Sequence, residues 1–206
     1  MKLYQDNGNF SPNVKRVRVM CNEVGAPVEH VPMDFMKGEW RTPEYLAKNP
    51  NGKVPTLDDD GYLLWESPAI LFHLASKYGE RGLLPTDARG KTEMMRWLFW
   101  NASHLEQSVN GLVVEKVIKP MMGQSTDNAR VESSTKDWER YAPILNGHLE
   151  GKQYVVGTYS IVDIAYATTV EMAVACGIDL TKYPHINAWY GRVTSRDAWK
   201  RASVKK

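Results

Sequence analysis

The chain has 206 residues, of which 43% are hydrophobic and 24% charged, as in a globular protein that can bury a core. Its net charge of +2 and the lack of an extended basic tract argue against a nucleic-acid partner. No apolar run approaches the ~20 residues of a membrane span, and the first residues lack the apolar core of a signal peptide, so we expect no membrane partner.

The first eighty residues alternate between strand and helix signals. Short strands are expected at residues 2–4 and 28–32. Between them Ser11-Pro12 opens a helix that stops at Gly25, since proline suits a first helical turn and glycine a helix end. The apolar residues of this helix recur at steps of three and four: Val14, Val17, Cys21 and Val24. Strand, helix and strand in this order predict a parallel pair of strands.

A hairpin followed by a helix is predicted from residue 49 to residue 78. The run Asn49-Pro50-Asn51-Gly52 has turn chemistry, and the strand after it carries Pro55. Proline cannot donate to a ladder, so it implies a sheet edge, a bulge or a cis bond that leaves backbone groups free. A second strand at 62–65 leads to Ser67, the expected N-cap of the next helix. Free backbone beside a helix N-terminus suits a small anionic peptide.

Helical patterns alone follow in the second part of the chain. A glycine- and proline-rich segment at 80–87 is the expected linker between a first domain at 1–79 and a second at 88–206. Ser160 and Asp163 have the spacing of a capping box. Long helices are expected at 88–120, 127–149, 160–176 and 184–195. The expected fold class is therefore α/β followed by all-α.

Five segments in the right order resemble the cytosolic glutathione transferase family over nearly the whole chain, and in particular its serine-type theta, phi and related bacterial classes. The family has a thioredoxin-like N-terminal domain and an all-helical C-terminal domain. The matching segments are the catalytic serine motif at 10–14, the cis-proline segment at 49–57, the glutathione-recognition pair at 66–67, the N-capping box at 159–165 and the C-terminal helix at 184–202.

The resemblance implies that Ser11 stabilises the thiolate of glutathione. A thiol is mostly protonated at neutral pH, and a hydrogen-bond donor at a helix N-terminus favours the thiolate. Capping the helix is the alternative role for Ser11. Asn13 and Asn9 are weaker candidates for polar support of the sulfur. Tyr4 lies in a strand, where packing in the core is the better explanation.

The peptide itself is expected to bind along the hairpin and the helix after it. The resemblance implies that the backbone of Val54, before cis-Pro55, pairs with glutathione like an added strand. Ser67 would bind the γ-glutamyl carboxylate and Glu66 the ammonium group. Lys53 is placed to meet the glycyl carboxylate, and a solvated lysine in a turn is the alternative.

Trp40 departs from the pattern, because many serine-type relatives carry histidine or glutamine there to hold the glycyl carboxylate. Trp40 offers only an indole N–H or hydrophobic cover, so Arg41 would have to help Lys53 in this role. A second substrate is expected between the domains. Its candidate lining residues, for each of which core packing is the alternative, are Phe10, Trp40, Trp100 and His104.

Two cysteines, Cys21 and Cys176, lie far apart in the sequence and form no metal or redox motif. We therefore expect a cytoplasmic protein with free thiols and no metal site. Cys21 lies on the apolar face of the first helix, which favours burial over a redox role.

The resemblance implies a homodimeric enzyme that uses glutathione as co-substrate and conjugates it to a hydrophobic electrophile. A glutathione-dependent dehalogenase, isomerase or peroxidase would use the same thiolate. A non-catalytic binding or scaffold protein on the same fold is the alternative from another class.

Overall fold

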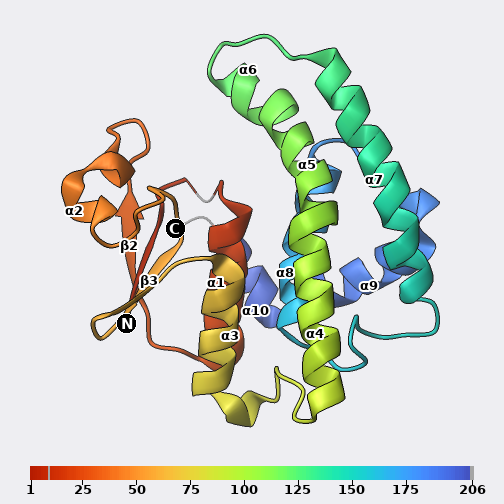
Figure 1. The fold of residues 1–206 in the computed structure, drawn as a ribbon, viewed down its shortest axis with the longest axis horizontal. Helices are drawn as coiled ribbons and strands as arrows, with labels where there is room; N and C mark the ends of the chain where they lie inside the picture. The colour runs from red at the N-terminus through yellow and green to blue at the C-terminus, as the bar shows by residue number, and fades with distance from the viewer. Residues whose placement is uncertain (9, 205–206) are drawn as a thin grey trace. The chain divides into compact units, whose positions relative to one another are not determined.

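A computed structural model of the chain describes residues 1–8 and 10–204 (Figure 1). The candidate Asn9 therefore lies outside the described residues. The chain divides into two compact units, Met1–Leu84 with the segment from Arg196 on, and Pro85–Ser195. The boundaries predicted from the sequence differ at the C-terminal end, where the last helix packs against the first one.

A mixed sheet forms the centre of the first unit. Its described strands lie in the order β2-β1-β3-β4, with β1 and β2 parallel and the other neighbours antiparallel. The predicted parallel pair is confirmed. The bounds are β1 (Lys2–Asp6), β2 (Glu29–Met33), β3 (Thr56–Asp59) and β4 (Tyr62–Leu64).

Two long helices, which pack on each other, lie on one face of this sheet, and the C-terminal helix lies against the first of them (Figure 1). They are α1 (Pro12–Val24), α3 (Ser67–Lys77) and α10 (Asp197–Ser203), and shorter helical segments are η1 (Glu39–Arg41), α2 (Pro43–Leu46) and η2 (Gly79–Arg81). Arg196 holds α10 in place, because its guanidinium donates to both oxygens of Glu23 at 2.7 and 2.9 Å.

The helix predicted at 184–195 is confirmed, but it does not continue to residue 202, as the family resemblance implies. The helix ends at Thr194, and Arg196 has an extended backbone (φ −67°, ψ 143°) before α10 begins. At this break, the side chain of Arg196 donates a hydrogen bond to Glu23 of α1. A contact across 173 residues leaves no periodic signal in the local sequence.

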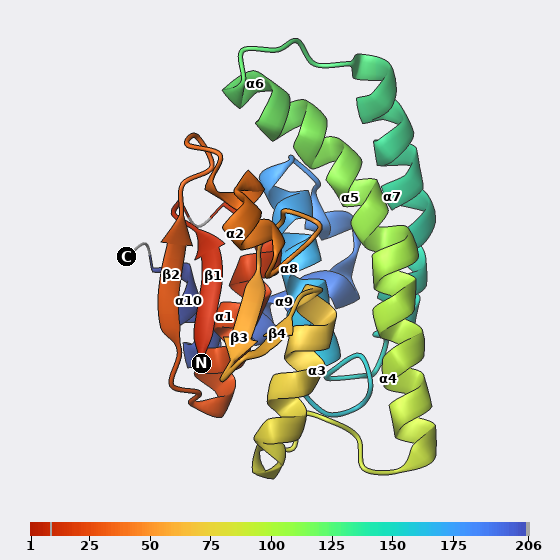
Figure 2. The same cartoon turned by 60° about the vertical axis from the view of Figure 1, so that its left-hand side comes forward.

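The second unit is helical, as predicted. It begins with a column of three helices that follow one another directly: α4 (Ala88–Trp100), α5 (Glu106–Val113) and α6 (Lys119–Met121). They are joined by two π-helical segments, Asn101–Leu105 and Val114–Ile118. Figure 2 shows α7 (Asn128–His148) returning alongside this column. The remaining helices are α8 (Ile161–Ala175), η5 (Leu180–Lys182) and α9 (Pro184–Thr194).

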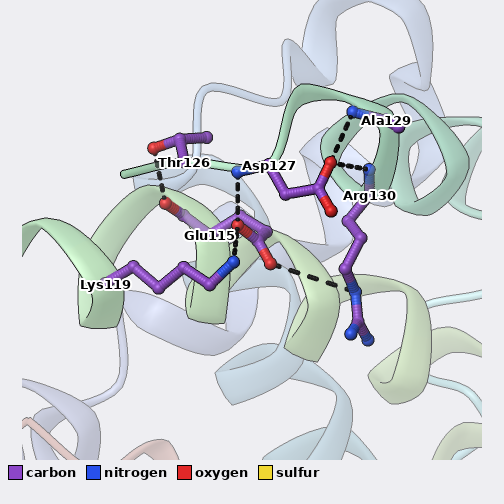
Figure 3. A network of polar contacts seen from close by, with 6 residues as sticks. All are labelled: Glu115, Lys119, Thr126, Asp127, Ala129 and Arg130. Atoms are coloured by element: carbon purple, nitrogen blue, oxygen red, sulfur yellow. Dashed lines mark hydrogen bonds and ion pairs between the residues drawn. The ribbon is translucent and has the colours of Figure 1, made fainter. Parts of the chain in front are cut away.

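Glu115 is a buried acid in the second π-helical segment, and its hydrogen bonds fix the position of the loop between α6 and α7 (Figure 3). Its Oε2 accepts from Lys119 Nζ at 2.7 Å and from the backbone N–H of Asp127 at 2.8 Å. Its backbone carbonyl accepts from Thr126, and Arg130 Nε lies 3.9 Å from Oε1. The hydrogen bond from Lys119, followed by that from the Asp127 backbone, lowers the pKa of Glu115. The carboxylate therefore stays charged and keeps these hydrogen bonds.

The predicted capping box at the start of α8 is confirmed. Ser160 Oγ accepts from the N–H of Val162, and Asp163 Oδ2 accepts from the N–H of Ser160 at 2.9 Å. Asp163 Oδ1 also accepts from the N–H of Val155 at 3.0 Å and from the indole N–H of Trp189 at 2.9 Å. One buried carboxylate therefore joins the preceding loop, α8 and α9.

No helix among the described residues combines the length and the apolar character needed to cross a bilayer.

Candidate functional site

Ser11 is the N-cap of α1. Its Oγ accepts from the N–H of Val14 at 3.3 Å, and its backbone carbonyl accepts from the N–H of Lys15 at 3.0 Å. The side chain is half-buried. A serine hydroxyl has one hydrogen to donate and two lone pairs. The capping bond uses a lone pair and not the hydrogen, so capping and donation to a thiolate are compatible roles.

The loop that carries Ser11 is held by Asp6, a buried residue at the end of β1. Asp6 Oδ2 accepts from the backbone N–H of Phe10 at 2.6 Å. The ring of Phe10 itself is 67% exposed. Asp6 therefore sets the position of the loop while the aromatic side chain faces solvent.

The segment before Pro55 is fixed by buried polar side chains, and the Val54–Pro55 peptide bond is cis. The carbonyl of Lys53 accepts from the Tyr45 hydroxyl at 2.6 Å and from Asn49 Nδ2 at 2.8 Å. The Tyr45 hydroxyl and Asn49 Nδ2 also lie within hydrogen-bond distance of Thr56 Oγ1, at 2.8 and 3.0 Å. Burial raises the pKa of Tyr45, so its hydroxyl stays protonated and can donate.

The first strand of the hairpin starts later than predicted. Strand β3 begins at Thr56, which pairs with Tyr4 of β1, so Pro55 lies just before the strand and not within it. Val54 precedes the first ladder pair of β3, and its side chain is half-buried. Its backbone thus lies outside that ladder, in a segment whose position Tyr45 and Asn49 fix.

The start of α3 differs from the prediction, because Ser67 is the first helical residue and not the N-cap. Glu66 is the cap: its carbonyl accepts from the N–H of Ile70 at 3.0 Å, and its backbone has φ 69°. A positive φ at a glutamate is uncommon and turns the chain sharply into the helix. The Glu66 side chain is exposed and makes no capping bond to the described residues of α3.

The hydroxyl of Ser67 points to α1 and not to its own helix. Ser67 Oγ donates to Asn13 Oδ1 at 3.0 Å and accepts from Arg16 Nη1 at 3.4 Å. The structure therefore brings together three of the predicted residues, since Asn13 lies in the first turn of the helix that Ser11 caps.

The three candidates for the glycyl carboxylate lie in different surroundings. Trp40 is half-buried in η1, and its ring lies 3.9 Å from that of Phe35, centroid to centroid. Lys53 and Arg41 are exposed. The indole is thus held by a neighbouring aromatic ring, whereas both cations extend into solvent.

Two predicted pocket residues, Trp100 and His104, lie in the second unit, in a cluster of half-buried aromatic rings. His104 lies 6.0 Å from Trp100 and 5.1 Å from Tyr141, centroid to centroid. The other two, Phe10 and Trp40, lie in the first unit. The lining of a second-substrate site by these four residues stays a prediction.

The cysteines are both free and buried. Burial raises the pKa of Cys21 to about 12, which makes a reactive thiolate unfavourable there, as the sequence predicts. Tyr4 is half-buried, and its ring lies 5.9 Å from that of Tyr45. Among the residues that the structure describes, no group of three or more His, Cys, Asp or Glu side chains is placed to hold a metal ion.

Sequence reasoning missed the supporting residues of the site, among them Asp6, Arg16, Tyr45 and Thr56. Only Asn49 carried a local signal, because an asparagine before proline is typical of a turn. The others act across the fold: Arg16 and Ser67, for example, are 51 residues apart.

A thioredoxin-like domain with a cis-proline just before β3, joined in sequence to a helical domain, is the arrangement that the resemblance to the glutathione transferases implies. The chain matches the family model "Glutathione S-transferase, N-terminal domain" over residues 1–76 and "Glutathione S-transferase, C-terminal domain" over residues 109–197. It belongs to the glutathione S-transferase family.

Plant and bacterial relatives are similar over nearly their whole length. Glutathione S-transferase F10 of Arabidopsis thaliana is 34% identical, with 93% of this chain and 92% of the relative covered. Glutathione S-transferase 3 of Zea mays is 32% identical, with 98% and 92% covered. GstB of Escherichia coli K12 is 30% identical, with 92% of each covered.

Solved structures agree with this assignment. A glutathione S-transferase I bound to lactoylglutathione has a TM-score of 0.90 at 26% identity, covering 100% of this chain and 99% of that one. The maize glutathione S-transferase I in complex with an atrazine glutathione conjugate has a TM-score of 0.88 at 26% identity, covering 98% and 95%.

Proposed function

We propose that the protein is a glutathione transferase, which joins the sulfur of glutathione to an electrophilic carbon of a hydrophobic substrate. The observation that carries the proposal is the hydrogen bond between Ser67 and Asn13, which ties the start of α3 to the start of α1. One helix start suits the γ-glutamyl carboxylate and the other the thiolate, so a single small peptide can use both.

In the proposed reaction, Ser11 donates its hydroxyl hydrogen to the sulfur and so favours the thiolate over the thiol. The sulfur lone pair forms a bond to the electrophilic carbon. In a substitution the leaving group departs with the electrons of its own bond, and the thiol proton passes to solvent. Ser11 itself forms no covalent bond.

The rest of the peptide would lie along the first unit. Val54, before Pro55, offers its backbone to the cysteinyl part, Glu66 meets the ammonium group and Ser67 the carboxylate. Lys53 and Arg41 would meet the glycyl carboxylate. The exposure of Glu66, Lys53 and Arg41 supports these roles, because each side chain can reach a ligand from solvent.

Retention on immobilised glutathione, together with conjugation of 1-chloro-2,4-dinitrobenzene, tests the proposal. A chlorinated aromatic ring is the first electrophile to try, because the maize relative binds the glutathione conjugate of atrazine. We expect both retention and conjugation. Retention without turnover of aryl halides, alkyl halides or peroxides would favour the scaffold alternative, and failure of both would refute the proposal.

We also propose that the enzyme is a homodimer. Large apolar side chains that are exposed on each unit support it: Tyr62, Trp65 and Phe72 on the first, Met95 and Phe99 on the second. Phe99→Lys is then expected to shift the protein toward a monomer in sedimentation velocity. A wild-type protein that sediments as a monomer would contradict the dimer.

A cytoplasmic location completes the proposal. Two free, buried cysteines support it, because secreted proteins of oxidising compartments commonly pair their thiols. Fractionation of the native host with an antibody against this chain would test it, and recovery outside the cytoplasm would contradict it.

A further inference from the structure

Arg16 is a buried cation beside the candidate site. It lies in α1, five residues after Ser11, and only 1% of its surface is exposed. A guanidinium in such a place is costly unless it donates hydrogen bonds to fixed partners. One of those partners is the hydroxyl of Ser67, 3.4 Å from Nη1.

The hydroxyl of Ser67 is oriented by α1 on two sides. It accepts from Arg16 and donates its only hydrogen to Asn13 Oδ1 at 3.0 Å. Asn13 and Arg16 are three residues apart in the same helix, so they lie on one face and reach Ser67 together. In this structure the Ser67 hydrogen therefore points to Asn13.

We propose that Arg16 is a positioning residue for glutathione, which acts on the γ-glutamyl carboxylate through Ser67. The inference rests on the proposed function and concerns the same site. When the carboxylate binds, the Ser67 hydrogen turns from Asn13 to a carboxylate oxygen, while Arg16 keeps donating to Ser67 Oγ. Donation from a cation polarises the hydroxyl and makes it a stronger donor.

The permanent charge of Arg16 has a second effect. The guanidinium lies beside Ser67, the first residue of α3, where the helix dipole already favours an anion. Both effects act on the carboxylate, and neither requires Arg16 to touch it. Their loss should raise the KM for glutathione and leave kcat, which depends on the sulfur, nearly unchanged.

Arg16→Gln tests this with two thiol substrates. One is glutathione, and the other is γ-aminobutyryl-cysteinyl-glycine, its decarboxylated form, which lacks the γ-glutamyl carboxylate and keeps the amine. We expect the KM for glutathione to rise about tenfold and the KM for the decarboxylated form to change less than about twofold.

Two further variants separate positioning from general support of the fold. Arg16→Lys keeps the charge and one donor, so it should recover part of the lost discrimination between the two thiols. Arg18→Gln is the matched control, because Arg18 is a buried arginine of the same helix that donates to the carbonyl of Val204. It should lower Tm and leave the discrimination at the wild-type value.

An equal rise in KM for both thiols in Arg16→Gln would overturn the inference and assign Arg16 to support of the fold. If Arg16→Gln does not fold, Arg16→Lys carries the test, with an expected rise of about threefold for glutathione alone. A wild-type enzyme that binds no glutathione would instead refute the proposed function.

Discussion

Helices α8 and α3 each have a serine at their start, and the two serine hydroxyls make different contacts. At the start of α8, the Ser160 hydroxyl accepts from the helix itself, and Asp163 accepts from the backbone before it. At the start of α3, the Ser67 hydroxyl turns away to Asn13 of α1, and the cap residue Glu66 leaves its carboxylate in solvent. The start of α8 is thus closed by the protein's own side chains. The start of α3 is open, since it has no side-chain cap among the described residues, and in the proposed function it binds the γ-glutamyl carboxylate.

The two helices are consequently held at different points. Asp163 fixes α8 at its first turn, where it also reaches Val155 and Trp189. Helix α3 is held further along, where Asp59 of β3 accepts from Lys77 at 2.6 Å and pairs with His73 at 2.7 Å. Helix α3 is therefore supported near its C-terminal end as well as by the hydrogen bond from Ser67 to Asn13 of α1.

Breaking the closed start should give the largest effect. Asp163→Ala leaves the N–H groups of Ser160, Val155 and Trp189 buried without an acceptor, at about 1–3 kcal/mol each before relaxation. We expect the free energy of unfolding to fall by about 4 kcal/mol in urea titrations. Glutathione affinity of the remaining folded protein should not change, and a tenfold loss of affinity at an unchanged Tm would contradict the structural role.

Ser11→Ala removes the proposed donor to the thiolate and should have the next largest effect. Loss of one donor to a developing or stabilised anion typically costs about 10²-fold, so kcat/KM should fall by about that factor. The capping bond to Val14 is lost as well, at about 1 kcal/mol of stability. Ser11→Thr keeps both functions and is the control. Full activity in Ser11→Ala would refute the catalytic assignment but not the enzyme.

Glu66→Gln tests the open start directly. The isosteric change removes the negative charge proposed to meet the ammonium of glutathione, and the KM should rise about tenfold. Because the side chain makes no capping bond to α3, Tm should stay within about 1 °C of the wild type. Glu44→Gln, at an exposed acid of the first turn of α2, should change neither quantity. A fall in Tm without a change in KM would assign Glu66 to the fold.

Acid titration should reveal the support at the other end of α3. Hydrogen bonds from Lys77 and His73 hold the pKa of Asp59 below its ordinary value. A lowered pKa in the folded state stabilises the protein above the ordinary value, and the contribution is lost as the pH falls through the folded one. Asp59→Asn should therefore lower Tm by about 3 °C at pH 7 and have no effect near pH 2. A pH-independent difference would exclude the ion pairs as its cause.

Local chemistry predicted the closed start better than the open one. Ser160 and Asp163 are three residues apart, so the capping box can be read from the sequence. The same reasoning made Ser67 an N-cap, which was wrong, because the positive φ of Glu66 moves the helix start and has no signature in residue type. The role of Arg16 depends on packing between α1 and α3, and such long-range partners leave no periodic pattern.

Trp40→His should have the smallest effect, at the opposite end of the proposed ligand. The indole lies against Phe35 with ring centroids 3.9 Å apart, and an imidazole of smaller area would lose part of that contact. It would gain a second ring nitrogen for the glycyl carboxylate, so we expect the KM for glutathione to fall about threefold. Trp40→Phe keeps the aromatic contact and adds no donor, and should leave the KM unchanged or slightly raised. If histidine raises the KM as well, Trp40 contributes through its packing, and the grip on the glycyl end already resides in Lys53 and Arg41.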